Sequence, residues 1–273
     1  MGGVWFDSFI PHIIITREKT FLLKLTQLLS LEISTSCNLS YNHCHHCPVA
    51  HIKRDRSRSL TDDLIFEIVR SAYLELEFSG FVSWGFYNEP MLEWPRMLYL
   101  TQKIKDEIPQ SKFFLWTNGT VRVKDDRMKL FNRTYISNYD KLPHAHYLPY
   151  FYNCYERVGG GQPLDNRLEI YKNETENDVR CLAPFSDFII NNSGDVHICC
   201  LDWNNEIKIG NAFDYSLKEL DELRTDYIKK ISGAKMLESA HKVCKSCPYK
   251  WDIAAMNLQL RDRAVEYANT LPC

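Results

Sequence analysis

The stretch CNLSYNHCHHC, residues 37–47, decides how the rest of the chain is interpreted, because it gathers three cysteines in a short loop. Cys44 and Cys47 form a Cys-x2-Cys pair, and Cys37 precedes them. Thiolates are the ligands that hold iron–sulfur clusters in proteins. Three thiolates can bind three irons of a 4Fe–4S cube and leave the fourth iron open. An open iron can bind a small molecule and pass it an electron.

A second group of cysteines lies in the C-terminal part of the chain. Its members are Cys181, Cys199, Cys244 and Cys247. Four thiolates can hold another cluster that has no open iron. The chain has 10 cysteines, and clustering as Cys-x2-Cys pairs is more typical of metal binding in a reducing compartment than of a disulfide framework. One open and one closed cluster together indicate redox chemistry.

Composition sets wide limits on the type of protein. The chain has 273 residues, of which 45% are hydrophobic, so we expect one large domain with an appendage or two domains. The net charge of −2 gives no indication of a nucleic-acid or membrane partner. We see no export signal, and no apolar stretch approaches the roughly 18 residues of a membrane span. We therefore expect a cytoplasmic protein.

The first half of the chain alternates between strand and helix patterns. Strands are expected at 28–35, 78–86, 113–117 and 133–137, and helices at 61–76, 93–108 and near 123–131. Thr61 can cap the first of these helices. Such alternation favours a parallel α/β sheet or partial barrel, which binds ligands at the carboxyl ends of its strands.

The pattern changes after about residue 150. The segment RVGGGQPLDN (157–166) predicts a Gly-rich connection, residues 188–200 predict a hairpin, and residues 216–231 predict a helix. We expect a small cysteine-rich α+β domain here. The predicted division of the chain is an N-terminal extension at 1–27, a barrel at 28–150, a connector at 151–174 and the second domain at 175–273.

The order of motifs along residues 30–137 resembles the radical S-adenosylmethionine (SAM) enzymes. The matching pieces are the strand into the cysteine loop, GFYNEP at 85–90, TNG at 117–119 and YIS at 135–137. The resemblance implies a partial (β/α)6 TIM-like barrel. It also implies a 4Fe–4S cluster on Cys37, Cys44 and Cys47 whose open iron binds the amino and carboxylate groups of SAM.

The resemblance also assigns roles around SAM. Glu89 and its neighbouring backbone would receive the SAM amino group, Asn118 and Ser137 would hold the ribose or carboxylate, and His46 would lie near the adenine. Most members have three residues between the first two cysteines, whereas this chain has six. For this reason nearby histidines stay open as alternatives to the first ligand: His43, His45 and His51.

The second cysteine group resembles the auxiliary-cluster module called SPASM in its shortened "twitch" form. CLAPF at 181–185, GDVHICCLD at 194–202 and IGN at 209–211 carry this resemblance. It implies one auxiliary 4Fe–4S cluster on Cys181, Cys199, Cys244 and Cys247, with Cys200 and Cys273 as spare thiols. From the residues alone, a zinc site is the alternative, at this group or built from Cys44, Cys47, Cys244 and Cys247.

The function implied is reductive cleavage of SAM to methionine and a 5′-deoxyadenosyl radical, which abstracts a hydrogen atom from the substrate. The expected outcome is net two-electron oxidation of a small polar substrate, such as an aminocyclitol or sugar alcohol. The auxiliary cluster would accept the substrate's electron. A low-potential reductant such as flavodoxin or ferredoxin would supply the electron that reduces the first cluster.

Alternative functions stay open. In a redox-neutral epimerase, Cys154 would return a hydrogen atom to the substrate radical, and Arg157 is a candidate substrate contact. A peptide-modifying radical SAM enzyme is a second alternative. A zinc-structured or electron-transfer protein without catalytic activity is the alternative from another class.

Overall fold

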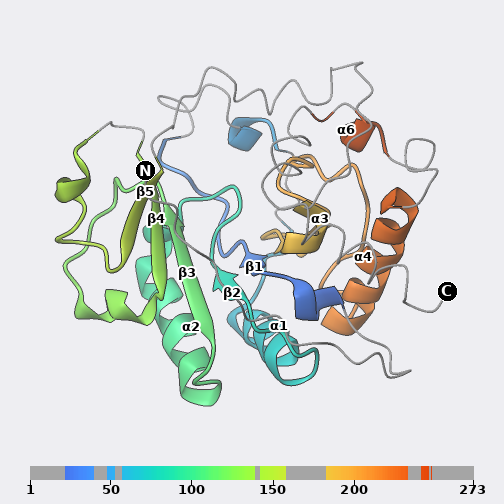
Figure 1. Ribbon diagram of the computed structural model, residues 1–273, viewed down its shortest axis with the longest axis horizontal. Helices are drawn as coiled ribbons and strands as arrows, with labels where there is room; N and C mark the ends of the chain where they lie inside the picture. The colour runs from blue at the N-terminus through green and yellow to red at the C-terminus, as the bar shows by residue number, and fades with distance from the viewer. Residues whose placement is uncertain are drawn as a thin grey trace, which may run out of the picture.

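The computed structural model describes residues 22–39, 48–52, 57–138, 142–157, 183–232, 241–245 and 247. Cys44, His46, Cys47, Cys181 and most of the predicted connector lie outside the described residues. The described part is built around one sheet, with helices packed on it (Figure 1). In this part of the chain, no helix is long and apolar enough to cross a membrane.

The sheet has seven strands in the order β5-β4-β3-β2-β1-β6-β7. They are β1 (Leu28–Leu31), β2 (Phe81–Ser83), β3 (Lys112–Thr117), β4 (Arg133–Ser137), β5 (Cys154–Arg157), β6 (Asp187–Ile190) and β7 (Val196–His197). Strands β1 to β6 pair in parallel, and β7 runs antiparallel to β6. The predicted α/β fold is confirmed, and the sheet is compatible with a partial barrel. The carboxyl ends of the parallel strands form one edge, here called the rim.

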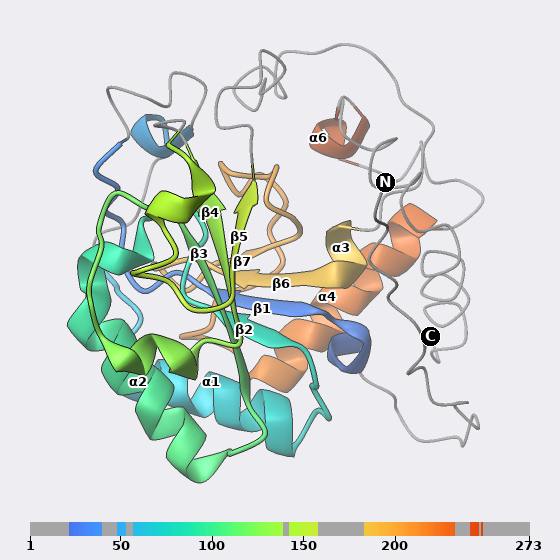
Figure 2. The same cartoon turned by 60° about the vertical axis from the view of Figure 1, so that its left-hand side comes forward.

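Three long helices cover one face of the sheet (Figure 2). They are α1 (Asp62–Leu74), α2 (Trp94–Glu107) and α4 (Leu217–Ser232). As predicted, Thr61 caps α1, and its side-chain oxygen accepts the Leu64 N–H at 3.2 Å. The covered face presents alternate strand residues to the helices, all of them fully or almost fully buried: Leu29, Leu31, Val82, Phe113, Leu115 and Ile136. Burial of this apolar face supplies the main driving force for the fold.

The remaining elements are short. They are η1 (Leu22–Leu25), η2 (Pro48–Ala50), η3 (Pro90–Glu93), η4 (Asp126–Leu130), η5 (His144–His146), α3 (Ala183–Ser186) and α6 (Lys242–Lys245).

Several predicted boundaries differ from the structure. The helix expected at 93–108 is preceded by η3, because Pro90 lacks an N–H and starts a tight turn before α2. The helix expected near 123–131 is only the 3-10 helix η4, whose first turn is capped by Asp125. The strand expected at 78–86 is confined to β2, and the chain from Trp84 onward leaves the sheet to form a rim loop.

The C-terminal part of the chain shares the barrel's sheet. Strand β6 pairs with β1, and Leu28 lies opposite Asp187. The predicted hairpin at 188–200 exists as β6 and β7, so it extends this sheet beyond β1. The division into a barrel at 28–150 and a second domain at 175–273 stays a prediction.

A buried ion pair closes the end of the sheet opposite the rim. Arg224 of α4 donates to Asp221 at 3.0 Å, to the Thr26 hydroxyl at 2.9 Å and to the Asp187 backbone carbonyl at 3.0 Å. The second carboxylate oxygen of Asp221 accepts the N–H of Leu23 at 3.0 Å. Both charged side chains are fully buried. This pair therefore fastens α4 to η1 and to the starts of the neighbouring strands.

Candidate functional site

The rim brings together the residues that the sequence assigned to SAM. Cys37 follows β1, Glu89 follows β2, Asn118 follows β3, and Ser137 ends β4. Because these strands are parallel neighbours, the four positions come to the same edge of the sheet. Among the three predicted ligands of the first cluster, only Cys37 is among the described residues, and it is half-buried.

Glu89 is the centre of the hydrogen bonds at this rim. Its carboxylate accepts the Thr117 hydroxyl at 2.7 Å, the Asn118 N–H at 2.7 Å and the Met91 N–H at 3.0 Å. The side chain is buried, and burial raises the pKa of Glu89 although these hydrogen bonds act to lower it. The carboxylate thus joins the ends of β2 and β3.

The same loop is tied to the first cysteine loop. The backbone N–H of Glu89 donates to the carbonyl oxygen of Ser36 at 2.8 Å, directly before Cys37. The Asn118 amide donates to the side-chain oxygen of Asn38 at 2.9 Å, and the Asn38 amide donates to the Thr120 hydroxyl at 2.8 Å. Both residues that flank Cys37 are therefore held by the other rim loops.

The turn after β3 requires glycine. Gly119 has a φ of +72°, and a Cβ there would lie 2.8 Å from the Tyr147 ring and 2.9 Å from the Ile136 side chain. Only glycine adopts this conformation and tolerates so close an approach. The turn fixes the direction in which Asn118 presents its amide.

Ser137 is held by an aromatic group that the sequence analysis missed. Its hydroxyl oxygen accepts the indole N–H of Trp116 at 2.8 Å. Trp116 also lies 6.1 Å from the Tyr135 ring, and Tyr135 lies 5.1 Å from Phe114. These rings are on the sheet face that the helices leave uncovered. The sequence KFFLWT does not mark this second face, because apolar residues occupy both faces of β3; only the burial pattern of the folded strand separates them.

Two further rim residues were missed by sequence reasoning. Glu32 is fully buried directly after β1, and its carboxylate accepts the N–H groups of Tyr87 and Asn192, each at 3.0 Å. Tyr87 belongs to the GFYNEP motif and donates its hydroxyl to the carbonyl oxygen of Cys200 at 2.6 Å. The sequence did contain a signal for Glu32: it is a charged residue inside the apolar run LLSLEIS, and a charged residue in such a run is buried only when it has partners.

The described residues of the second cysteine group lie among apolar side chains. Cys247 is buried, and Cys199 and Cys244 are half-buried against the core, whereas Cys200 is exposed. The Tyr227 hydroxyl lies 3.9 Å from the Cys244 sulfur, and burial, together with this thiol, raises the pKa of Tyr227. Thiols shielded from water are suitable ligands for an iron–sulfur cluster. The burial of Cys199 also favours it over Cys200 as the ligand.

No three described side chains lie close enough to hold a single metal ion. The residues present nevertheless fit the two clusters in donor type: thiols at Cys37, Cys199, Cys244 and Cys247. Cys44, Cys47 and Cys181 would complete the two sets, and the alternative histidines His43 and His45 also lie outside the described residues. His51 is exposed beyond η2.

The two candidate substrate contacts on β5 fall on different positions of the strand. Cys154 pairs with Thr134, which is fully buried, and it packs against the core. Arg157 pairs with Ser137 at the rim. Since aligned residues of neighbouring strands share a face, Cys154 lies on the helix-covered face. The roles suggested for both residues stay predictions.

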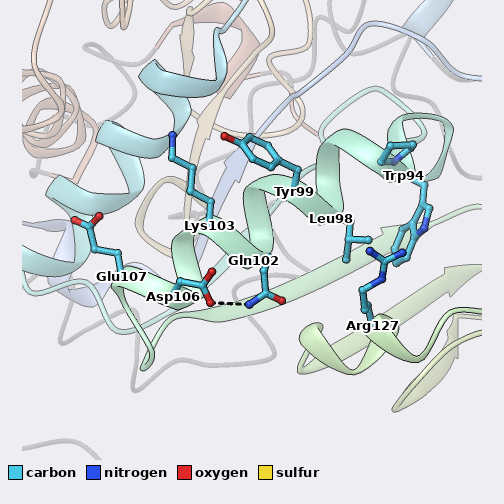
Figure 3. Close-up of a pocket in the computed structure, with 9 residues that line it drawn as sticks. Trp94, Leu98, Tyr99, Gln102, Lys103, Asp106, Glu107 and Arg127 are labelled. Carbon is cyan, nitrogen blue, oxygen red and sulfur yellow. Dashed lines mark hydrogen bonds between the residues drawn. The ribbon is translucent and has the colours of Figure 1, made fainter.

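A groove is also present on the outer surface of α2 (Figure 3). Its lining comes from α2 and η4 rather than from the rim: Trp94, Leu98, Tyr99, Lys103 and Arg127. Gln102 donates to Asp106 at 2.7 Å along its floor. The groove contains none of the predicted site residues, so it is separate from the candidate site.

Comparison with known proteins identifies relatives of both regions. Residues 181–248 match the SPASM iron–sulfur cluster-binding domain. Over 243 residues the chain is 24% identical to an S-adenosyl-L-methionine-dependent 2-deoxy-scyllo-inosamine dehydrogenase of Niallia circulans, covering 82% of this chain and 93% of the relative.

Solved structures show the same fold. The crystal structure of BtrN in complex with AdoMet and 2-DOIA matches with a TM-score of 0.59 and 20% identity, covering 82% of this chain and 93% of that one. An open conformation of BtrN matches with a TM-score of 0.55 and 17% identity, covering 82% and 92%. These findings confirm the predicted resemblance to radical SAM enzymes of the SPASM/twitch subgroup. They also support the predicted cofactors, SAM and 4Fe–4S clusters that include an auxiliary one.

Proposed function

We propose that this protein is a radical SAM dehydrogenase that oxidises a carbinol carbon of a small polar substrate, an aminocyclitol or sugar alcohol, to a ketone. The observation that carries the proposal is the rim. There, Glu89 and Asn118 are hydrogen-bonded to both neighbours of Cys37, so the cysteine loop and the SAM motifs form one unit. The related dehydrogenase of Niallia circulans acts on 2-deoxy-scyllo-inosamine, which is an aminocyclitol.

When bound, the clusters and SAM would supply the radical chemistry: the transfer of one electron into SAM and the removal of a hydrogen atom from the substrate. Cys37, Cys44 and Cys47 would hold the first cluster. Cys181, Cys199, Cys244 and Cys247 would hold the auxiliary cluster.

The chain's own residues position SAM. The Glu89 carboxylate accepts hydrogen bonds from three donors, so it shapes the loop, and Glu89 with its neighbouring backbone would receive the SAM amino group. Ser137 accepts from Trp116 and can still donate its hydroxyl hydrogen to the ribose. Asn118 would contact the ribose or carboxylate, and His46 would flank the adenine.

Dehydrogenation is favoured over epimerisation because the auxiliary cysteine set provides an electron acceptor. The placement of Cys154 against the core gives the epimerase alternative no geometric support. We further propose that a low-potential reductant such as flavodoxin or ferredoxin supplies the electron, in a reducing cytoplasm where clustered thiols persist.

Anaerobic reconstitution followed by turnover tests this proposal. We expect about eight irons per chain, as two 4Fe–4S clusters require. With aminocyclitol substrates, dithionite should give 5′-deoxyadenosine together with a ketone. In deuterated water, a product with unchanged oxidation state that carries solvent deuterium would indicate epimerisation instead. About one zinc per chain without SAM cleavage would eliminate the enzyme proposal.

A further inference from the structure

A single residue, Tyr87, is hydrogen-bonded both to the region of the predicted SAM cluster and to the region of the predicted auxiliary cluster. It is 5% exposed and lies two positions before Glu89 in the SAM loop. Its backbone N–H donates to Glu32 at 3.0 Å, which fixes it to the end of β1. Its hydroxyl donates to the carbonyl oxygen of Cys200 at 2.6 Å. The side chain thus spans from the SAM loop to the segment that follows β7.

Glu32 makes the second connection between the same two regions. One oxygen of its carboxylate binds Tyr87, and the other accepts the N–H of Asn192 at 3.0 Å. Asn192 lies in the turn between β6 and β7, and its amide donates to the Glu32 carbonyl oxygen at 3.2 Å. The β6–β7 hairpin is therefore attached to the SAM side at its turn, through Glu32, and at its far end, through Tyr87. Together with the pairing of β6 with β1, these two attachments fix the hairpin relative to the SAM loop.

The segment between these attachments is braced internally. The ring of His197 is buried. Its Nδ1 lies 2.7 Å from the Asp202 carbonyl oxygen, which requires a hydrogen on Nδ1 and leaves Nε2 to accept the Asn191 amide at 3.0 Å. The ring also packs against Phe86, with 4.7 Å between the centroids. The segment that contains Cys199 and Cys200 is therefore held by hydrogen bonds on both sides, and the Asp202 N–H donates to the Cys199 carbonyl oxygen at 3.3 Å.

We infer that Tyr87 is a positioning residue that holds the auxiliary-cluster loop at a fixed separation from the SAM loop, and so controls how efficiently the substrate radical is oxidised. The inference rests on the proposed function and deepens it. After hydrogen abstraction, the substrate radical becomes a ketone by giving its hydroxyl proton to water and one electron to the auxiliary cluster. If that transfer slows, the substrate radical is instead reduced back to the alcohol by one electron from dithionite and a proton from water, so that SAM is consumed without formation of ketone. The two outcomes differ in how much ketone forms for each SAM that is consumed.

The test compares Tyr87→Phe with a matched tyrosine variant. Tyr87→Phe removes only the hydroxyl, so its effect is measured as the ratio of ketone to 5′-deoxyadenosine rather than as the rate of SAM cleavage. The ratio of ketone to 5′-deoxyadenosine should fall roughly three- to tenfold, as expected for loss of one hydrogen bond that sets a geometry. Tyr73→Phe is the control, because the Tyr73 hydroxyl donates to the Gly80 carbonyl at 2.8 Å within the helix-covered layer. The same hydroxyl accepts the N–H of Lys112 at 3.0 Å, so this control should lower the melting temperature at least as much as Tyr87→Phe and leave the ratio unchanged.

A spectroscopic readout separates positioning from a general loss of stability. In a background with Ala at Cys37, Cys44 and Cys47, only the auxiliary cluster is present. Tyr87→Phe should change the EPR line shape and midpoint potential of that cluster, and Tyr73→Phe should not. Cys200→Ala keeps the carbonyl that Tyr87 binds, so it should retain auxiliary iron and the wild-type ratio.

Three results would overturn the inference while leaving the proposed function intact. The first is that Tyr87→Phe keeps the wild-type ratio of ketone to 5′-deoxyadenosine and the wild-type midpoint potential of the auxiliary cluster. The second is that Tyr87→Phe and Tyr73→Phe change these quantities equally. The third is that Cys200→Ala loses auxiliary iron. The proposed function itself fails separately, if the wild-type protein cleaves SAM without forming any ketone.

Discussion

The two ends of the sheet both contain buried carboxylates, but they hold them in different ways. At the rim, Glu89 and Glu32 accept hydrogen bonds from backbone N–H groups of neighbouring loops. At the opposite end, Asp221 is paired with the fully buried Arg224. The rim carboxylates hold neighbouring loops against one another, whereas the ion pair fastens distant parts of the chain together. Substitutions at the two ends should therefore separate catalysis from stability.

The largest effect is expected at the ion pair. Arg224→Met leaves the Asp221 carboxylate buried without its cation, and breaking a buried pair in this way costs about 3–5 kcal/mol of unfolding free energy. Urea unfolding of the anaerobically prepared protein measures this loss. Any fraction that remains folded should still cleave SAM, because the rim is untouched.

The matched control is Arg70→Met. Arg70 bonds Glu107 at 3.2 Å on the surface, where ion pairs contribute at most about 1 kcal/mol. Equal stabilities of the Arg224→Met and Arg70→Met proteins would contradict the assignment of the Asp221–Arg224 pair as the fastening at this end.

At the rim, Glu89→Gln should damage activity more than stability. A glutamine presents an NH2 group to one of the three donors that the carboxylate now accepts, which leaves that donor unpaired. We expect SAM cleavage to fall roughly 10- to 100-fold, with a loss of about 1–3 kcal/mol in stability. Rates of 5′-deoxyadenosine formation and thermal melting measure the two effects. Wild-type cleavage in a destabilised variant would show that the carboxylate serves only the fold.

A smaller effect, with a pH dependence, is expected at Asp187. Burial raises its pKa to about 6, although the Ser186 hydroxyl and Arg224 act to lower it. An unfolded aspartic acid titrates near about 3.9, so between these values the folded protein holds a proton that the unfolded chain has released. Stability therefore falls as the pH rises from about 4 to about 6, and the loss persists above it.

Asp187→Asn removes the titrating carboxyl group and therefore the loss of folding stability at higher pH. The variant should be more stable than wild type by about 3 kcal/mol at pH 7.5, and the difference should vanish near pH 4. Denaturant unfolding at both pH values checks the sign. A difference that does not change with pH would rule out titration of this carboxyl group as its cause.

Local patterns account for the parts of the fold that could be predicted. The helix after Thr61 and strand β1 follow from a cap and from the residue alternation over 28–35, both of which act over a few residues. The pairing of β6 with β1 could not be predicted, because the two strands are far apart in the sequence. The same is true of the contact of Arg224 with Thr26.

The candidate site shows the same limit. Short motifs marked Glu89, Asn118 and Ser137, and the parallel sheet places all three at the rim. The residues that connect them to other regions carry no motif of their own: Trp116 is recognised by its bond to Ser137, and Tyr87 by its bond to Cys200. Both bonds depend on the folded arrangement of separate segments.

The central claim is that Cys37, Cys44 and Cys47 hold a cluster whose open iron binds SAM. EPR of the dithionite-reduced protein, recorded with and without SAM, tests it most directly. We predict that SAM changes the spectrum of the wild-type protein and of a variant with Ala at Cys199, Cys244 and Cys247, and that Ala at Cys37, Cys44 and Cys47 abolishes the change. A spectrum that SAM leaves unaltered, or SAM cleavage that survives the loss of those three thiols, would contradict the account.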